Sequence, residues 1–281
     1  MSLFVLSGGG MRGMDIIAGQ LRALAEANIR PGAICGTSAG AGIAALVAAG
    51  YTAAATASII AGLRDKDVRS ERWFWKPRAL WIDHFLESGP IRRILHQHLP
   101  AQPEELRIPY ACATTRVTDG AEIVWSTHPD IIPGRPLAGL PDWREAVLAS
   151  MSISGVFPWV CIDPAEPVQY ADGGVRANLP LPPNWPTFDS VYLLIASYTN
   201  DYAPAGASIL SRLLLNASWY AQDQIEDVLA RVHRAAANKL TVPPVKILWP
   251  PPRAKGAGLL RFDHTLIPAA HRAAQKTIDR I

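Results

Sequence analysis

The chain has 281 residues, of which 49% are hydrophobic and 18% are charged, and its formal net charge is +3. This composition excludes an intrinsically disordered chain, and the lack of a dense basic stripe argues against nucleic acid as a partner. Three widely spaced cysteines, Cys35, Cys112 and Cys161, lie in apolar runs. They are typical of buried reduced thiols, which predicts a cytoplasmic protein without a disulfide framework or a metal site.

The first half of the chain alternates between predicted strands and helices. A buried strand is predicted over 2–7, and a helix over 14–28, where apolar residues repeat at helical spacing. A short strand follows the turn at 31–32 and ends before Ser38. The pattern then predicts helices over 39–49, 53–63 and 91–99, and strands over 108–114 and 122–126 that form a hairpin at 118–120.

The second half continues the same alternation. It predicts a helix over 142–150 with Asp142 as its cap, strands over 168–171, 191–196 and 245–249, and a long helix over about 206–239. Strands that alternate with helices predict an α/β fold, here a three-layer sandwich with a mostly parallel central sheet flanked by helices. No linker interrupts the pattern, so we expect residues 1–281 to form a single domain.

One segment, from Pro31 to Leu63, contains no charged residue and could be mistaken for a membrane span. It consists mainly of Ala, Gly, Thr and Ser, so it would gain little free energy on entering lipid. Gly50 is also a helix stop in the middle of the segment. We therefore favour buried helices, with membrane insertion as the alternative.

Two glycine-framed turns near the start of the chain are its most informative feature. Gly8–Gly13 follows the apolar run 3–6, and Gly36–Gly40 follows 33–35. Each pattern predicts a strand, a sharp turn and a helix. The second turn is a G-x-S-x-G sequence, which places a serine hydroxyl, that of Ser38, at the top of a sheet. Glycines suit both sides of such a turn because it leaves no room for side chains.

Ser38 is therefore the candidate nucleophile, and main-chain N–H groups beside it are candidate donors to an oxyanion. The amide of Ala39 lies at a predicted helix start, and the glycine loop Gly8, Gly9 and Gly10 supplies further amides. The alternative is an ordinary glycine-rich turn in which Ser38 only caps a helix.

The glycine loop has a second interpretation, because G-x-G-x-x-G up to Gly13 also fits the dinucleotide-binding fingerprint. That fingerprint requires an acidic residue about 20 positions further on, and the window 28–34 contains none. We therefore favour the oxyanion hole, with a non-hydrolytic dinucleotide-binding protein as the remote alternative. Arg12 within the loop either braces the backbone or attracts an anionic head group; a surface salt bridge is its other interpretation.

The serine also needs a base. None of the seven histidines lies in a recognisable catalytic turn, although spacing alone permits a Ser-His-Asp triad. Asp172 is the better candidate because it ends a predicted strand. Gly173 and Gly174 follow it and permit close backbone approach. An ordinary Asp-Gly turn is the alternative.

The ordered motifs G-G-G-M-R-G, G-T-S-A-G and D-G-G together resemble the patatin-like phospholipases. The resemblance extends to 149–158 and to Asn178 and Pro180, and it covers about 3–50 and 146–180 well. It implies a Ser-Asp dyad without histidine that acts on acyl esters of lipids, with Ser38 as nucleophile, Asp172 as base and glycine-loop amides as oxyanion donors. Residues 151–155 depart from the family, which usually places Ala and Pro there, and this change reshapes the expected acyl pocket.

We therefore expect a serine acyl hydrolase of phospholipids or lysophospholipids that needs no cofactor. A hydrolase of small soluble esters or thioesters is the alternative. Trp73–Trp75 is surrounded by Arg and Lys side chains, a combination that suits transient contact with a membrane surface. Aromatic side chains buried in the core at a helix edge are the other interpretation of this segment.

Overall fold

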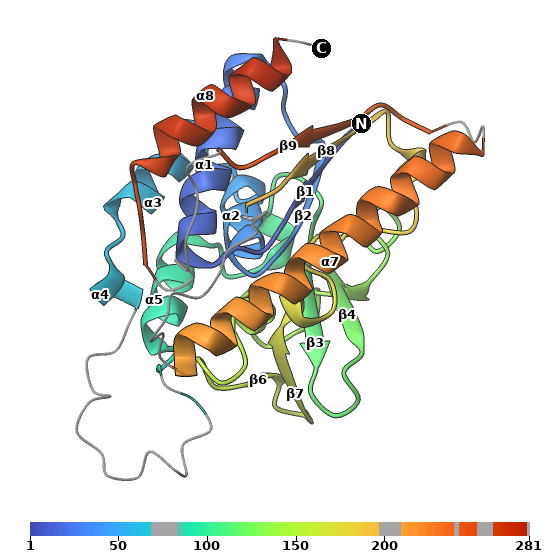
Figure 1. Ribbon diagram of the computed structural model, residues 1–281. Helices are drawn as coiled ribbons and strands as arrows, with labels where there is room; N and C mark the ends of the chain where they lie inside the picture. Colours follow the sequence, from blue (N-terminus) through green and yellow to red (C-terminus); the bar gives the residue numbers. More distant parts are fainter. Residues whose placement is uncertain (69–83, 85, 197–208, 239–241, 252–260, 280–281) are drawn as a thin grey trace.

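The computed structural model describes residues 1–68, 84, 86–196, 209–238, 242–251 and 261–279, and within them it contains a sheet of nine strands (Figure 1). Trp73–Trp75, for which a membrane contact was expected, lies outside these residues. The strands are β1 (Ser2–Leu6), β2 (Ala33–Thr37), β3 (Tyr110–Arg116), β4 (Glu122–Ser126), β5 (Arg135–Pro136), β6 (Val160–Asp163), β7 (Glu166–Asp172), β8 (Ser190–Leu194) and β9 (Val245–Leu248).

The sheet is mixed but mostly parallel. Its main order is β5-β4-β3-β2-β1-β8-β9, and the run from β3 to β9 is parallel throughout. Antiparallel pairing is confined to one side, where β3 pairs with β4 and with β7, and β7 pairs with β6. The predicted hairpin of β3 and β4 is therefore confirmed, and β7 brings Asp172 opposite Thr114 of β3.

Helices cover both faces of the sheet, which confirms the predicted α/β sandwich (Figure 1). The alternation of β1 shows why: Phe4 and Leu6 enter one core cluster, whereas Leu3 and Val5 enter the other. The long helix α7 packs on the second face. The helices are α1 (Gly10–Glu26), α2 (Ala39–Ala48), α3 (Ala53–Gly62), α4 (Asp65–Val68), α5 (Gly89–His98), α6 (Arg144–Ser150), α7 (Ile209–Ala237) and α8 (Leu266–Ile278).

The charge-free segment forms two helices of ten residues each, α2 and α3. Nine of the ten residues of α2 are buried, because the helix packs against β2 and inside the larger core cluster. The interpretation as buried helices is therefore confirmed for α2. Among the described residues, no helix combines the length and the apolar character that crossing a bilayer requires.

Several local expectations need correction. The first helix begins at Gly10, so the glycine loop leads directly into it. Helix α6 begins at Arg144, and Asp142 lies outside it while still accepting a hydrogen bond from the Arg144 amide at 3.1 Å. Cys35 and Cys112 are buried, but Cys161 is exposed. An apolar run in an edge strand still alternates between faces, and Cys161 occupies the outer face of β6.

Candidate active site

The candidate nucleophile occupies a strained turn between β2 and α2. Ser38 has φ 53° and ψ −124°, a left-handed φ that is uncommon for a residue with a side chain. Gly36 and Gly40 make the turn possible, because a Cβ on Gly36 would lie 2.5 Å from the Gly40 carbonyl, and a Cβ on Gly40 would lie 2.6 Å from the Ser7 carbonyl oxygen. The Ser38 amide donates to Ser150 Oγ at 3.0 Å, which fixes the turn from α6.

The structure brings together Ser38 and Asp172, which lie 134 positions apart in the sequence. Ser38 Oγ donates to Asp172 Oδ2 at 2.6 Å, and the Gly174 amide donates to Asp172 Oδ1 at 2.6 Å. Asp172 is only 5% exposed. Burial raises its pKa from 3.8 to about 6, and the hydrogen bonds from Ser38 and Gly174 oppose the rise without cancelling it. Gly173, the next residue, is held against the Ala113 carbonyl without room for a side chain.

Histidine takes no part in the described contacts of this pair. His264 and His271 are paired with carboxylates elsewhere, at Asp15 and Glu26. His98 lines the same pocket as Ser38, but its Nδ1 lies 3.4 Å from the Tyr51 hydroxyl. The geometry therefore favours a carboxylate base over an imidazole base.

The glycine loop lies beside the serine, but its amides are not equivalent. The Gly8 amide donates to the Asn178 carbonyl at 2.9 Å, so it is not available to an oxyanion and the expectation for Gly8 needs correction. Gly9 precedes α1, and Gly10 begins it with φ 61°. Because the first amides of a helix have no partner within it, those of Gly10 in α1 and Ala39 in α2 remain as candidate donors.

Two further residues of the glycine loop, Arg12 and Gly13, lie in the first turn of α1. The Gly13 amide donates to the Gly9 carbonyl at 3.0 Å and so closes the first turn of α1. A Cβ on Gly13 would lie 3.1 Å from the Ala196 side chain, which explains the close packing of α1 on the end of β8. Arg12 is half-buried in the same turn.

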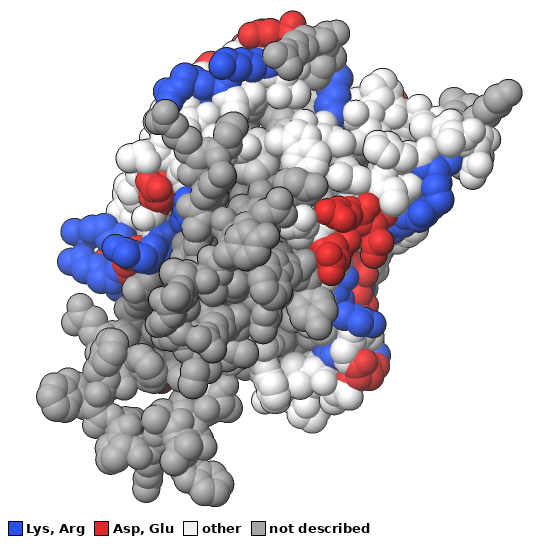
Figure 2. Space-filling model, in the orientation of Figure 1, with Lys and Arg blue, Asp and Glu red and all other residues white. Residues whose placement is uncertain are grey.

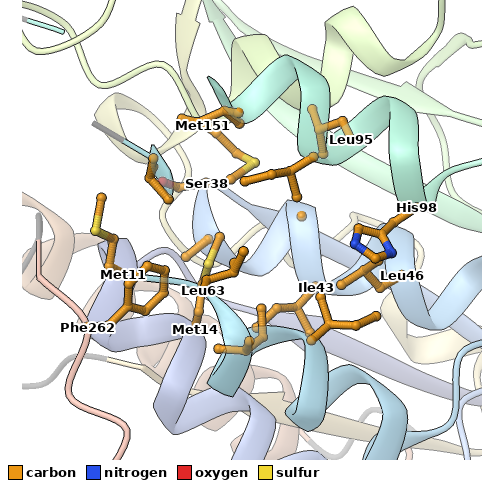
Figure 3. A pocket seen from close by; sticks show the side chains of 18 of the residues that line it. Met11, Met14, Ser38, Ile43, Leu46, Leu63, Leu95, His98, Met151 and Phe262 are labelled. Carbon is orange, nitrogen blue, oxygen red and sulfur yellow. The ribbon is translucent and has the colours of Figure 1, made fainter. Parts of the chain in front are cut away.

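Ser38 lines a pocket whose walls are almost entirely apolar side chains (Figure 3). Helix α2 lines it with every third or fourth residue, namely Ala39, Gly42, Ile43 and Leu46. This face extends about 10 Å from the serine at 1.5 Å per residue. In Figure 3, Ser38 and His98 lie on opposite sides of the pocket, with Met151 and Leu95 between them.

A buried ion pair holds the outer wall of this pocket. Asp15 on α1 is fully buried, and its oxygens lie 2.7 Å from His264 Nδ1 and from the Asp263 amide. His264 Nε2 lies 2.9 Å from the Leu63 carbonyl. Both ring nitrogens of His264 therefore face oxygen atoms, an arrangement that suits the doubly protonated ring. Burial alone would lower the pKa of His264, but the bonds to Asp15 and Leu63 raise it. The His264 ring stacks on Phe262, which lines the pocket.

The family follows from a comparison with known sequences. The model of the patatin-like phospholipase family matches residues 4–185, which include both glycine turns and Asp172. The chain belongs to the patatin-like phospholipase family.

Individual relatives show the same similarity over a part of their length. The patatin-like chain is 33% identical over 186 residues to patatin-like phospholipase domain-containing protein 7 of Mus musculus, and 32% identical to patatin-like phospholipase domain-containing protein 6 of Homo sapiens. Each alignment covers 63% of this chain and 12% of the relative, so the chain spans about an eighth of the length of these proteins. VipD from Legionella pneumophila has a similar fold, with a TM-score of 0.50 at 14% identity over 100% of this chain and 67% of VipD.

In the described part of this patatin-like chain, one group of side chains has the spacing of a metal site. His96, Asp142 and Glu145 place their ligand atoms within 4.8 Å of one another. However, Arg144 pairs with Asp142 at 2.7 Å and Arg92 pairs with Glu145 at 2.6 Å. The charges are already neutralised, and the group is better described as an ion-pair network that ties α5 to α6.

Sequence reasoning missed the residues that hold this patatin-like site from behind. Ser150 and Asn178 lay within the family resemblance but had no assigned role. In the structure, Ser150 Oγ accepts a hydrogen bond from the Ser38 amide, and the Asn178 carbonyl accepts one from the Gly8 amide. Gln224 on α7 had no sequence signal at all. Its bonds to the segment after Asp172 are visible only in the fold.

Proposed function

We propose that the chain is a serine acyl hydrolase that cleaves carboxylic esters of lipids, with Ser38 as nucleophile and Asp172 as base. The observation that carries this proposal is the 2.6 Å contact between Asp172 Oδ2 and Ser38 Oγ, since Ser38 also lines an apolar pocket. A hydroxyl that donates to a buried carboxylate and faces an apolar cavity is arranged for attack on an acyl group.

In the proposed reaction, Asp172 accepts the proton of Ser38 as its oxygen attacks the ester carbonyl. The C–O bond to the alcohol then breaks, and the alcohol leaves with that proton. Water attacks the acyl-enzyme with Asp172 again as base, which releases the fatty acid and restores the serine. An ordinary aspartate is a weak base at neutral pH, and the raised pKa of Asp172, about 6, reduces this disadvantage.

The developing oxyanion would be bound by main-chain donors. Gly10 and Ala39 line the pocket together with Ser38 and belong to the first turns of two helices. Their amides, with that of Gly9, form the proposed oxyanion hole, because helix N-termini stabilise negative charge. Removal of one such donor typically costs on the order of 10²–10³ in rate.

The apolar pocket supports a lipid substrate. Apart from Ser38 and His98, its walls consist of aliphatic, Met and Phe side chains and glycine, a surface that suits an acyl chain and offers a small polar ester few partners. The family name and the names of the relatives, which call them phospholipases, point to the same class of substrate. We therefore favour esters of phospholipids or lysophospholipids over short soluble esters, thioesters and dinucleotides.

We also propose that the whole chain forms one catalytic domain. The family match ends at residue 185, yet β8 and β9 continue the same sheet and α8 packs on α1. Strands and helices on both sides of residue 185 therefore share one core.

The test is covalent labelling followed by hydrolysis. A fluorophosphonate probe and mass spectrometry should locate one adduct, on Ser38, and Ser38→Ala should abolish it. Ser58→Ala is the matched control, since Ser58 is exposed on α3 and, in the part of the chain that the structure describes, its hydroxyl donates to the Ala54 carbonyl alone. Long-chain lysophospholipid in mixed micelles and a p-nitrophenyl acetate arm then separate lipid from soluble-ester hydrolysis. Labelling elsewhere, or none, would contradict the proposal.

A further inference from the structure

Helix α7 crosses the face of the sheet opposite α1 and α2 (Figure 1). It lies beyond residue 185, where the family match ends. Ile225, Val228 and Val232 are buried in the second core cluster and fix the described half of the helix on the sheet. Gln224, next to Ile225, is thereby placed against the segment that follows Asp172.

The side-chain amide of Gln224 makes three hydrogen bonds, all to the main chain of one short segment. Its Oε1 accepts from the Asn178 amide at 2.6 Å. Its Nε2 donates to the Val175 carbonyl at 2.9 Å and to the Gly174 carbonyl at 3.2 Å. A primary amide can accept and donate at once, whereas an ammonium group can only donate and a carboxylate can only accept.

Two residues of this segment, Gly174 and Asn178, connect Gln224 to the proposed reacting groups. Gly174 is the residue whose amide donates to Asp172 Oδ1 at 2.6 Å. Asn178 is the residue whose carbonyl accepts the Gly8 amide at 2.9 Å and so holds the glycine loop beside Ser38. One side chain therefore supports both the carboxylate and the loop of the proposed oxyanion hole.

We propose that Gln224 is a positioning residue for the proposed dyad, acting through the main chain of 174–178. The inference rests on the proposed function of Ser38 and Asp172. Gln224 keeps the Gly174 amide aimed at Asp172 Oδ1 and keeps Asn178 in place behind the glycine loop. It touches neither reacting group itself.

The charges near Asp172 and near Gln224 allow a positional effect of a Gln224 substitution to be distinguished from a direct electrostatic effect. Among the described residues, the groups that bond or pair with Asp172 include Ser38 from the β2–α2 turn, Thr114 and Thr115 from β3 and Gly174, and these four are uncharged. The carboxylates near Gln224, those of Asp223, Glu226 and Asp227, are exposed to solvent, and acidic groups gather over the middle of α7 in Figure 2. An effect of an uncharged substitution at Gln224 on the pKa of Asp172 should therefore pass through the main chain of 174–178 and not through a change of charge.

Gln224→Met is the test, because methionine keeps the length and lacks the hydrogen-bonding groups. Displacement of the dyad by a fraction of an ångström should lower kcat about 10- to 100-fold, with KM unchanged because Gln224 does not line the acyl pocket. Weakening the Gly174 bond removes a group that favours the ionised carboxylate, so the acid limb of kcat/KM should move up by about one pH unit.

Gln222→Met is the matched control, since Gln222 lies two residues away on α7 and, among the described residues, its side chain bonds to Glu226 alone. Gln224→Glu keeps the acceptor for the Asn178 amide but turns a carboxylate oxygen toward the Gly174 and Val175 carbonyls, so it should lose at least as much kcat as Gln224→Met. All rates are taken per folded molecule, well below each melting temperature. If Gln224→Met has a lower melting temperature but unchanged kcat and pH profile, the inference about Gln224 is overturned and the proposed function is not. Absence of fluorophosphonate labelling in the unsubstituted protein would overturn the proposed function and this inference with it.

Discussion

Replacing Asp172 by asparagine should remove activity and yet stabilise the fold at neutral and alkaline pH. The structure allows asparagine to keep both contacts of the aspartate. Its Oδ1 can accept from the Gly174 amide, and its Nδ2 can donate to Ser38 Oγ, at positions where the present distances are 2.6 Å each. What changes is the burial of a negative charge.

The size of the effect follows from the pKa of Asp172. A rise from 3.8 to about 6 means that the folded protein holds this proton more tightly than the unfolded chain does. The favourable contribution is therefore complete below about pH 4 and is lost as the pH rises through 6. At pH 8 the ionised carboxylate costs about 3 kcal/mol relative to a neutral group, which corresponds to a melting temperature about 5–10 °C lower.

Thermal unfolding of both proteins at pH 4 and pH 8 tests this argument. Asp172→Asn should melt higher than the unsubstituted protein at pH 8, and the difference should vanish at pH 4. Its rate of ester hydrolysis at pH 8 should fall by orders of magnitude, because the amide cannot accept the Ser38 proton. A variant that melts lower than the unsubstituted protein at both pH values would refute the reasoning, since the buried charge would then not be the dominant effect.

Three further outcomes are expected. Below about pH 6, kcat/KM for a p-nitrophenyl ester should rise about tenfold per pH unit and then level off, because only ionised Asp172 accepts a proton; a midpoint near pH 4 would contradict the role of burial. Gly42→Leu should lower the turnover of long-chain esters at least about tenfold and spare the acetate ester, since a Cβ on Gly42 already lies 3.0 Å from Met151 Sδ in the pocket. Gly62→Leu, which meets open space, is its control, and equal profiles for the two variants would exclude this pocket as the acyl site. Ser150→Ala removes the acceptor of the buried nucleophile amide and should lower the unfolding free energy by about 1–3 kcal/mol in urea titrations; an unchanged midpoint would show that the bond does not hold the turn.

The parts of the fold that sequence predicted are those with a local cause. The strand before each glycine turn and the helix after it follow from apolar spacing and from the turn chemistry of Gly36 and Gly40. The first two motifs follow the carboxyl ends of β1 and β2, which are parallel neighbours. Asp172 ends β7, which is antiparallel to β3, so its pairing with Ser38 across 134 positions was implied by the family resemblance and not by parallel-sheet geometry.

The parts that sequence missed depend on distant partners. The Gly8 amide could not be removed from the oxyanion donors without knowing that the Asn178 carbonyl faces it. Cys161 was assigned to the core because its neighbours are apolar, but only the pairing of β6 decides which face it occupies. Gln224 belongs to the polar stripe of an amphipathic helix, and nothing in that pattern distinguishes it from Gln222.

The pairing of three neighbouring strands has a consequence for how the protein fluctuates. Thr37, immediately before the serine, pairs with Ala113, and the next residue of β3, Thr114, pairs with Asp172. The residue before the hydroxyl and the residue that bears the carboxylate thus pair with neighbouring residues of one strand, β3, in the interior of the sheet, the region that opens last in local unfolding. Breathing of surface helices leaves their separation intact. Amide exchange at these residues would report only whole-molecule opening, and loss of the dyad on heating would coincide with melting and not precede it.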